Sequence, residues 1–227
     1  MTATIETPAT TAPVMTFTVP ADDFTTALKN VALFADTDTT LPALCGVLLE
    51  MDAGGVLTFV ATDRYVLAKQ TLEPADDTHA GSGEVFIPAA TVKALAAVKA
   101  PKYGRPLITV SVADGGALTV ALPDATVVTY PAAEYSSFPK WRPIQDGFEA
   151  CPAGDTPALV AYNPAFLGKF AKVKPGSAVS NPLKLTQGTQ PHGRSQAAER
   201  GVVPQPTISR ARCGPVTAYI MHVRTDS

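Results

Sequence analysis

Residues Val56 to Ala68 read V-L-T-F-V-A-T-D-R-Y-V-L-A, and they follow a turn, Asp52-Ala53-Gly54-Gly55. Over residues 57–62 every second side chain is Leu, Phe or Ala, which is the two-residue period of a β-strand with one covered face. The polar triplet Thr62-Asp63-Arg64 breaks this pattern, and residues 65–69 resume it. The stretch therefore predicts two antiparallel strands that meet at a tight corner carrying a hydroxyl, a carboxylate and a guanidinium.

The corner has more than one interpretation. Asp63 is typical of a hairpin turn, where its carboxylate accepts hydrogen bonds from nearby backbone N–H groups. The same three side chains are also suited to a binding site at a sheet edge. An enzyme that uses Asp63-Arg64-Tyr65 would need an acid, base or nucleophile partner, and the sequence offers none.

A β-α-β-β-β unit surrounds this hairpin and then recurs. A strand at Thr16–Val19, a helix from Phe24 and a strand at Ala43–Met51 precede the two strands of the hairpin, and residues 84–130 repeat the order. The letters repeat as well, because Gly54-Gly55-Val56-Leu57-Thr58 with Asp63 matches Gly115-Gly116-Ala117-Leu118-Thr119 with Asp124. Turns rich in Gly and Asp are common, but the combined pattern favours an internal duplication.

The order of the predicted elements and the composition divide the chain into a tail, two domains and a linker. Two units that pack helix beside helix predict an α+β domain, with the helices on one face of curved antiparallel sheets. The second domain contains a third, incomplete unit and an irregular segment rich in arginine, which suits a mobile loop, a basic contact segment or a stretch that departs from its ancestor. The predicted parts are a disordered tail at 1–14, a two-unit domain at 15–144, a linker at 145–156, and a shorter domain at 157–227 with its irregular segment at 187–214.

Composition limits the possible functions. No apolar run in the 227 residues approaches about 20, so no membrane span is expected, and residues 1–15 do not resemble a secretory signal. The three cysteines lie far apart, which indicates neither a disulfide framework nor a zinc site, and a cytoplasmic protein is expected. Phosphate-binding loops and paired metal-ligand motifs are absent from the sequence, so we expect no cofactor, no metal and no catalytic residue.

Lysine is distributed unevenly. The helical stretches 24–35, 89–102 and 163–174 contain seven lysines and no acid, although the chain has 20 acids and a net charge of −2. A solvated helix face explains lysine, but it does not explain the missing glutamate, which forms helices equally well. The pattern therefore favours contact with a polyanion, as in sequence-independent binding to duplex DNA. The candidate DNA-binding residues are Lys29, Lys93, Lys99, Lys102, Lys169, Lys172 and Lys174.

Four motifs together resemble one known family. They occur in the order typical of the bacterial DNA polymerase III β sliding clamp. The motifs are the strand Leu41–Leu49, the corner V-A-T-D-R-Y-x-L-A, the closing Phe138-Pro139-Lys140-Trp141 and the final Ile220–Arg224. Arg64 stands where that family usually has glycine, and His222 replaces a usual proline. The family has three domains of two units each, whereas this chain has three units.

The resemblance implies a DNA clamp-like fold and a clamp without catalytic activity. Clamps of this family form closed rings around duplex DNA, line the hole with lysine-bearing helices and tether DNA polymerase and clamp-loader proteins, so a homo-oligomeric ring is expected. Partners insert a hydrophobic peptide into a groove between domains. The groove residues implied here are Thr62, Leu67, Pro139, Met221, Val223 and Arg224. The alternative is a clamp-derived module that binds partner peptides without closing a ring.

Overall fold

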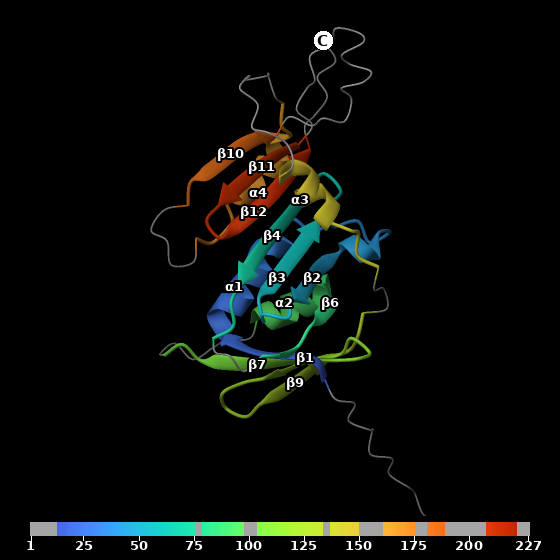
Figure 1. Ribbon diagram of the computed structural model, residues 1–227, viewed down its shortest axis with the longest axis vertical. Coiled ribbons are helices and arrows are strands. Elements are labelled where there is room, and N and C mark those ends of the chain that lie inside the picture. Colours follow the sequence, from blue (N-terminus) through green and yellow to red (C-terminus); the bar gives the residue numbers. More distant parts are fainter. Residues whose placement is uncertain are drawn as a thin grey trace, which may run out of the picture.

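The computed structural model describes residues 13–75, 79–97, 104–133, 137–149, 161–175, 181–188 and 208–221 (Figure 1). Most of the expected tail at 1–14 and large parts of the segments 145–156 and 187–214 lie outside these ranges. So do four candidate site residues, Lys99, Lys102, Val223 and Arg224.

The first domain is built from the repeated β-α-β-β-β order that the sequence predicts. The first unit consists of β1 (Pro13–Pro20), α1 (Ala21–Ala32), β2 (Gly46–Met51), β3 (Leu57–Thr62) and β4 (Val66–Leu72), with a short 3-10 helix η1 (Pro42–Leu44) before β2. The second consists of β6 (Gly83–Pro88), α2 (Ala89–Ala97), β7 (Leu107–Ala113), β8 (Leu118–Ala121) and β9 (Val127–Tyr130), and a two-residue strand β5 (Ala80–Gly81) precedes it.

The remaining described elements are two helices and three strands. They are α3 (Arg142–Glu149), α4 (Pro164–Phe170), β10 (Leu183–Gly188), β11 (Ile208–Cys213) and β12 (Val216–Met221). Helix α3 occupies the first residues of the expected linker, and β11 lies inside the segment expected to be irregular. Its sequence I-S-R-A-R-C alternates small buried side chains with arginines, which is a strand pattern with one covered face.

Within the described ranges all strand pairs are antiparallel, and they form two sheets. The five-stranded sheet has the order β5-β1-β7-β8-β9, and the seven-stranded sheet has the order β10-β11-β12-β4-β3-β2-β6. The two units exchange strands, because β1 pairs with β7 and β2 pairs with β6. The α+β class with helices and antiparallel sheets is confirmed.

Helices α1 and α2 contact each other and pack against strands of both sheets. The main core contains side chains from both helices and both sheets, and the rings of Phe17, Phe24 and Phe59 meet at its centre, with centroid distances of 6.1 and 5.6 Å. Helix α1 begins earlier than expected, at Ala21 after Pro20, so Asp22 and Asp23 lie in its first turn and do not cap it. Carboxylates at that position are favourable because the first turn carries free N–H groups.

The second part of the chain continues the seven-stranded sheet. Strand β12 pairs with β4 through the register Thr217↔Lys69 to Ile220↔Val66. A second attachment comes from Asn30, which is buried in α1. Its side chain donates to the carbonyl of Lys174 over 3.1 Å and to Gln70 over 3.2 Å, and it accepts from the N–H of Lys174 over 2.8 Å. One side chain therefore holds helix α1 and the segment after α4 together.

We expect Asn30→Ala to lower the free energy of unfolding by about 2 kcal/mol, because the substitution leaves the partly buried main-chain groups of Lys174 and the buried amide of Gln70 without their partner. Urea unfolding followed by circular dichroism measures the change. The neighbouring and exposed Lys29→Ala is the control, with an expected change within about 0.5 kcal/mol. Equal stability of the two variants would contradict this role of Asn30.

Candidate functional site

The corner between β3 and β4 folds as a turn closed by its own carboxylate. Asp63 Oδ1 accepts hydrogen bonds from the N–H groups of Tyr65 and Val66 over 3.1 and 2.8 Å, as the hairpin interpretation predicts. The Thr62 hydroxyl accepts a bond from the Arg64 N–H over 3.1 Å. These bonds fix which way each side chain of the triplet points.

Arg64 has a backbone φ of 77°, in the left-handed region that favours glycine. Its guanidinium lies 3.4 Å from the carboxylate of Asp36 on the other side of the corner. The ion pair partly offsets the cost of the left-handed backbone. Glycine adopts this conformation without strain, in agreement with the glycine that the resemblance implies for this position.

The other oxygen of Asp63 reaches a different part of the chain. Asp63 Oδ2 pairs with the amino group of Lys169 on α4 over 2.7 Å, and the two side chains are only 12% and 25% exposed. Beside this pair, the rings of Tyr65 and Phe166 stack with their centroids 5.8 Å apart. The sequence suggests Lys169 for DNA binding. In this structure its amino group is paired with Asp63 at the corner.

The other described candidate lysines are exposed. Lys29 lies on α1 and Lys93 on α2, and these helices are adjacent. Phe34, just after α1, contacts Phe170 of α4 at 4.9 Å between ring centroids, so the end of α4 lies near the end of α1. Lys172 and Lys174 follow α4 and are exposed as well.

The groove residues implied by the motifs differ in how far their side chains are exposed to solvent. Thr62 and Leu67 are 6% and 3% exposed, whereas Met221 is 48% exposed and Pro139 lies on the surface. Met221 is close to the corner, because its N–H donates to the carbonyl of Tyr65 over 2.9 Å. Leu67 belongs to a buried cluster that the sequence did not predict, made of Leu48, Val60, Leu67, Trp141, Phe148 and Tyr219.

Helix α3 supplies the cover of that cluster and lies across the seven-stranded sheet (Figure 1). Phe148 packs edge-on against Tyr219 with a centroid distance of 5.6 Å. Gln145 accepts from Lys69 over 2.6 Å, and Glu149 pairs with Arg210 over 2.8 Å. The helix thus spans β4 and β11 by polar contacts, and its aromatic side chain excludes water from the strand between them.

Burial under α3 changes two titratable groups. Burial, with the nearby Glu149 carboxylate, raises the pKa of Tyr219 to about 12. Burial also lowers the pKa of Lys69, whose amino group bonds Gln145. Both shifts follow from the partial burial of these groups beneath α3.

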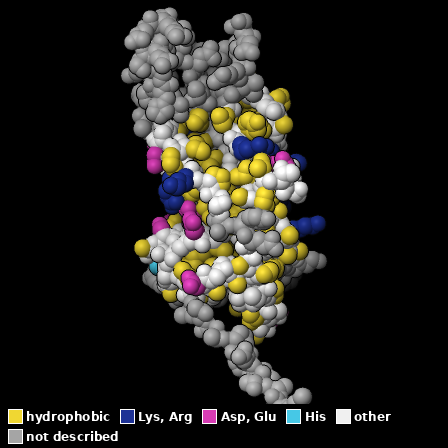
Figure 2. All heavy atoms as spheres, turned by 90° about the vertical axis from the view of Figure 1, so that its right-hand side faces the viewer, with side chains coloured by type: hydrophobic (Ala, Val, Ile, Leu, Met, Phe, Trp, Pro, Cys, Tyr) yellow, Lys and Arg dark blue, Asp and Glu magenta, His cyan; other side chains and the backbone are white. Residues whose placement is uncertain are grey.

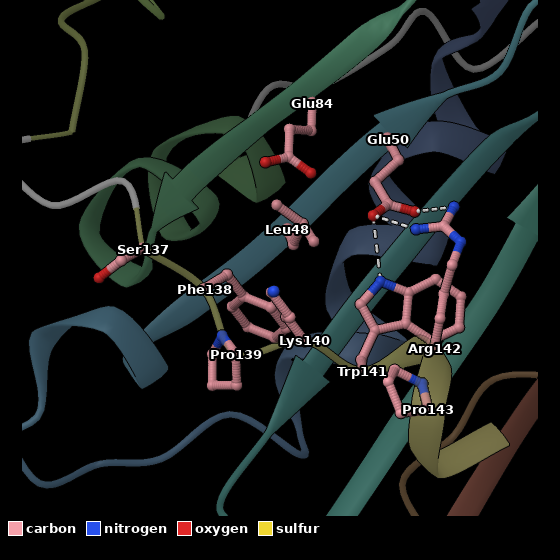
Figure 3. A pocket seen from close by; sticks show the side chains of 10 residues that line it. All are labelled: Leu48, Glu50, Glu84, Ser137, Phe138, Pro139, Lys140, Trp141, Arg142 and Pro143. Atoms are coloured by element: carbon pink, nitrogen blue, oxygen red, sulfur yellow. Dashed lines mark hydrogen bonds and ion pairs between the residues drawn. The ribbon is translucent and has the colours of Figure 1, made fainter. Parts of the chain in front are cut away.

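A cavity of about 470 Å³ opens beside this cover (Figure 3). Glu50 of β2 holds two side chains of the cavity wall in place. The Glu50 carboxylate accepts hydrogen bonds from the Trp141 indole over 3.0 Å and from both terminal nitrogens of Arg142 over 2.9 and 2.8 Å. The hydrogen bonds to Glu50 raise the pKa of Arg142. The cavity is lined by Leu48, Glu50, Glu84, Ser137, Phe138, Pro139, Lys140, Trp141, Arg142 and Pro143. Of these, the sequence motifs had marked only Pro139 as a site residue.

Two further observations concern other classes of function. Within the described ranges, no three His, Cys, Asp or Glu side chains come together as a metal site would require. The described helices also include none with the length and apolar character needed to cross a membrane.

Comparison with known proteins connects this geometry to one family. Residues 18–126 match the family described as DNA polymerase III beta subunit, central domain. The beta sliding clamp of Streptomyces coelicolor is 36% identical over 81 residues, which are 36% of this chain and 21% of that protein. The chain therefore matches about a fifth of the length of this curated relative.

Solved structures agree on the fold. DNA polymerase III subunit beta from Pseudomonas aeruginosa superposes with a TM-score of 0.53 at 16% identity, over 93% of this chain and 66% of that one. The putative DNA polymerase III beta subunit from Eubacterium rectale gives a TM-score of 0.61 at 10% identity, over 94% and 66%. The sliding clamp from Bartonella birtlesii, solved with griselimycin bound, gives 0.54 at 14% identity.

The fold is that of the sliding clamps. Residues 18–126, just under half of the chain, match the central domain of the DNA polymerase III β subunit, in agreement with the resemblance that the motifs suggest. The family is non-enzymatic, in agreement with the expectation that the chain is not an enzyme.

Tyr219 provides a test of the α3 cover. An unfolded tyrosine loses its proton near pH 10, whereas folded Tyr219 keeps it to about pH 12, so the folded state binds more protons between these values. Stability should therefore fall as the pH rises through this window, by about 1 to 2 kcal/mol from Tyr219. Urea unfolding at several pH values measures the slope.

The matched variant is Tyr219→Phe, which keeps the ring against Phe148 and removes the ionisable hydroxyl. Its stability should fall less steeply between pH 10 and 12 than that of the natural chain, with other tyrosines contributing equally to both. Identical slopes would mean that Tyr219 is not shielded by α3.

Proposed function

We propose that the chain is a sliding clamp that assembles with further copies into a ring around duplex DNA and holds replication partners there. The observation that carries the proposal is the row of adjacent helices with exposed lysines in a chain of net charge −2. Exposed lysines on neighbouring helices attract phosphates, and phosphates bind such lysines without reading sequence. A clamp of this kind would work in the cytoplasm and would need no cofactor.

The lysines are not equivalent in this proposal. Lys29, Lys93, Lys172 and Lys174 have exposed side chains and are placed to contact phosphate directly. Lys169 would first have to leave Asp63, which makes it a weaker contributor in the structure as it stands. Lys99 and Lys102 lie outside the described residues and remain candidates.

Free sheet edges support assembly with other copies. Strands β9 and β10 end the two sheets, and within the described part of the chain their outer edges pair with no other strand. Unpaired edges are templates for pairing with another chain. The chain spans 66% of the length of the solved clamps, so a ring of clamp size requires several copies.

Partner binding is the second half of the proposal. Pro139 and Met221 are accessible, and the apolar, flexible side chain of Met221 suits an adaptable peptide site. Val223 and Arg224 follow Met221 and are proposed to extend this site. Thr62 and Leu67 would contribute by supporting it from below, because both are buried. The proposed partners are DNA polymerase and clamp-loader proteins.

Mass in solution tests the ring. We expect light scattering over a concentration series to give one defined oligomer, and we expect that oligomer to be retained on closed circular duplex DNA and to slide off the same DNA once it is cut. Topological retention follows from encirclement and not from charge alone. A monomer at all concentrations, or equal retention on linear and circular DNA, would contradict encirclement and favour a peptide-binding module.

The lysine face is tested separately by charge reversal. Lys93→Glu combined with Lys172→Glu should weaken binding to short linear duplex DNA at least about tenfold near 100 mM salt and lower the salt slope by about 2, since two phosphate contacts are lost. Fluorescence anisotropy with labelled DNA measures both quantities.

The control carries the same change of charge on the sheet. Lys184 and Arg212 are exposed partners in the β10–β11 register, and Lys184→Glu with Arg212→Glu should leave DNA affinity nearly unchanged. Equal weakening by the two double variants would show that only net charge matters and would remove the helices from the interface.

A further inference from the structure

We propose that the cavity beside Pro139 is a docking site for an extended segment of a partner protein that carries one apolar side chain between an acidic and a basic one. This site lies next to the groove implied by the motifs and is distinct from it. The inference deepens the partner-binding half of the proposed function and rests on it.

The first argument is that the cavity is open where the expected groove is closed. Leu67 and Thr62 are buried, and Phe148 and Trp141 belong to the cluster that covers Leu67. Beside this cluster, about 470 Å³ remains open between the segment 137–143 and strands β2 and β6. That volume holds a large apolar side chain together with adjacent main chain.

The second argument is that the walls are held in place without a ligand. Glu50 is 7% exposed and binds both Trp141 and Arg142, and the Arg142 guanidinium lies 4.6 Å from the centre of the Trp141 ring. At the other end of the segment, Phe138 packs against Phe86 with a centroid distance of 6.1 Å. The rim is therefore fixed at both ends, which lowers the ordering cost of binding.

The third argument concerns charge. Glu50 and Glu84 are direct partners in the β2–β6 register. Arg142 forms a direct ion pair with Glu50, and its charge acts on Glu84 only at longer range. Within the described part of the chain, the carboxylate of Glu84 and the amino group of Lys140 have neither a hydrogen bond nor an ion pair. In the view of Figure 3, the apolar side chain of Leu48 lies between these two charged groups.

A ligand must complement this pattern of negative, apolar and positive groups. A basic side chain suits Glu84, an acidic side chain suits Lys140, and an apolar side chain between them suits the hollow over Leu48. The face of the molecule seen in Figure 2 mixes acidic, basic and hydrophobic side chains without a broad patch of one sign. Such a surface favours a mixed-charge peptide over a polyanion such as DNA.

The single tryptophan of the chain, Trp141, lines the cavity and reports on its occupation. The probes are three capped peptides, Ac-Gly-Glu-Phe-Arg-Gly-NH2, its order-reversed form with Arg before Phe and Glu after it, and a neutral form with glutamine in place of both charged residues. We expect one charged peptide to change the Trp141 emission saturably with a Kd below about 1 mM, and the neutral form to bind at least about fivefold more weakly.

Substitutions then locate the peptide. Glu84→Gln and Lys140→Gln should each weaken binding of the preferred peptide about fivefold, and the combined exchange Glu84→Lys with Lys140→Glu should invert the preference for peptide order. The matched controls Glu73→Gln and Lys184→Gln, on exposed side chains outside the cavity, should bind as the natural chain does.

Three results would overturn the inference. The first is no saturable change with either charged peptide up to about 5 mM. The second is unchanged binding by both Glu84→Gln and Lys140→Gln. The third is binding that depends on Met221 and not on these two residues, which would place the peptide in the groove implied by the motifs and leave the proposed function standing. Failure of the proposed function itself appears in the DNA retention experiment, which uses no peptide.

Discussion

The packing of the two parts of the chain against each other depends on the contacts of the Asp63 carboxylate. One oxygen closes the β3–β4 corner through two backbone N–H groups, and the other pairs with Lys169 of α4. The pair is largely shielded from water, so removing one partner leaves a charge with poor solvation and no counter-ion. Asp63 is a residue whose presence the turn alone would explain. Through Lys169 it also fixes the position of α4 against the first part of the chain.

That packing joins the second part of the chain to the seven-stranded sheet. Strand β12 extends the sheet beyond β4, Asn30 binds the main chain of Lys174, and α3 lies over the junction. Polar contacts to Lys69 and Arg210 connect α3 to both sides of the junction. The same arrangement buries Thr62 and Leu67, so the attachment of the second part and the closing of the expected groove have one physical cause.

The sequence predicted the helices and strands whose hydrophobic period is clear. It did not predict β11 and α3, whose period is obscured by other residues. Alternation in the hairpin, the repeated unit and the helical stretch expected from residue 163 all predicted observed elements. Asn163 caps α4 by accepting from the Ala165 N–H over 2.9 Å. Strand β11 was missed because its arginines suggested a basic segment, although Ser209, Ala211 and Cys213 between them are buried. Helix α3 was missed because prolines and a glycine nearby suggested a linker. No local pattern reveals that Lys169 meets Asp63, since the two are 106 residues apart.

The placement of charge separates two surfaces of the molecule. On α1, on α2 and just after α4, four candidate lysines remain exposed while Lys169 is paired with Asp63, and Asp22 and Asp23 lie one to two turns before Lys29 on α1. These exposed lysines attract an external anion. On the sheet side, the cations Arg142 and Arg210 are each matched by a glutamate of the same surface. A polyanion is therefore attracted to the helices and gains little at the sheet, whereas a peptide with both charges loses nothing by approaching the sheet. Since the two ligands favour different faces, the structure allows both to be bound at once.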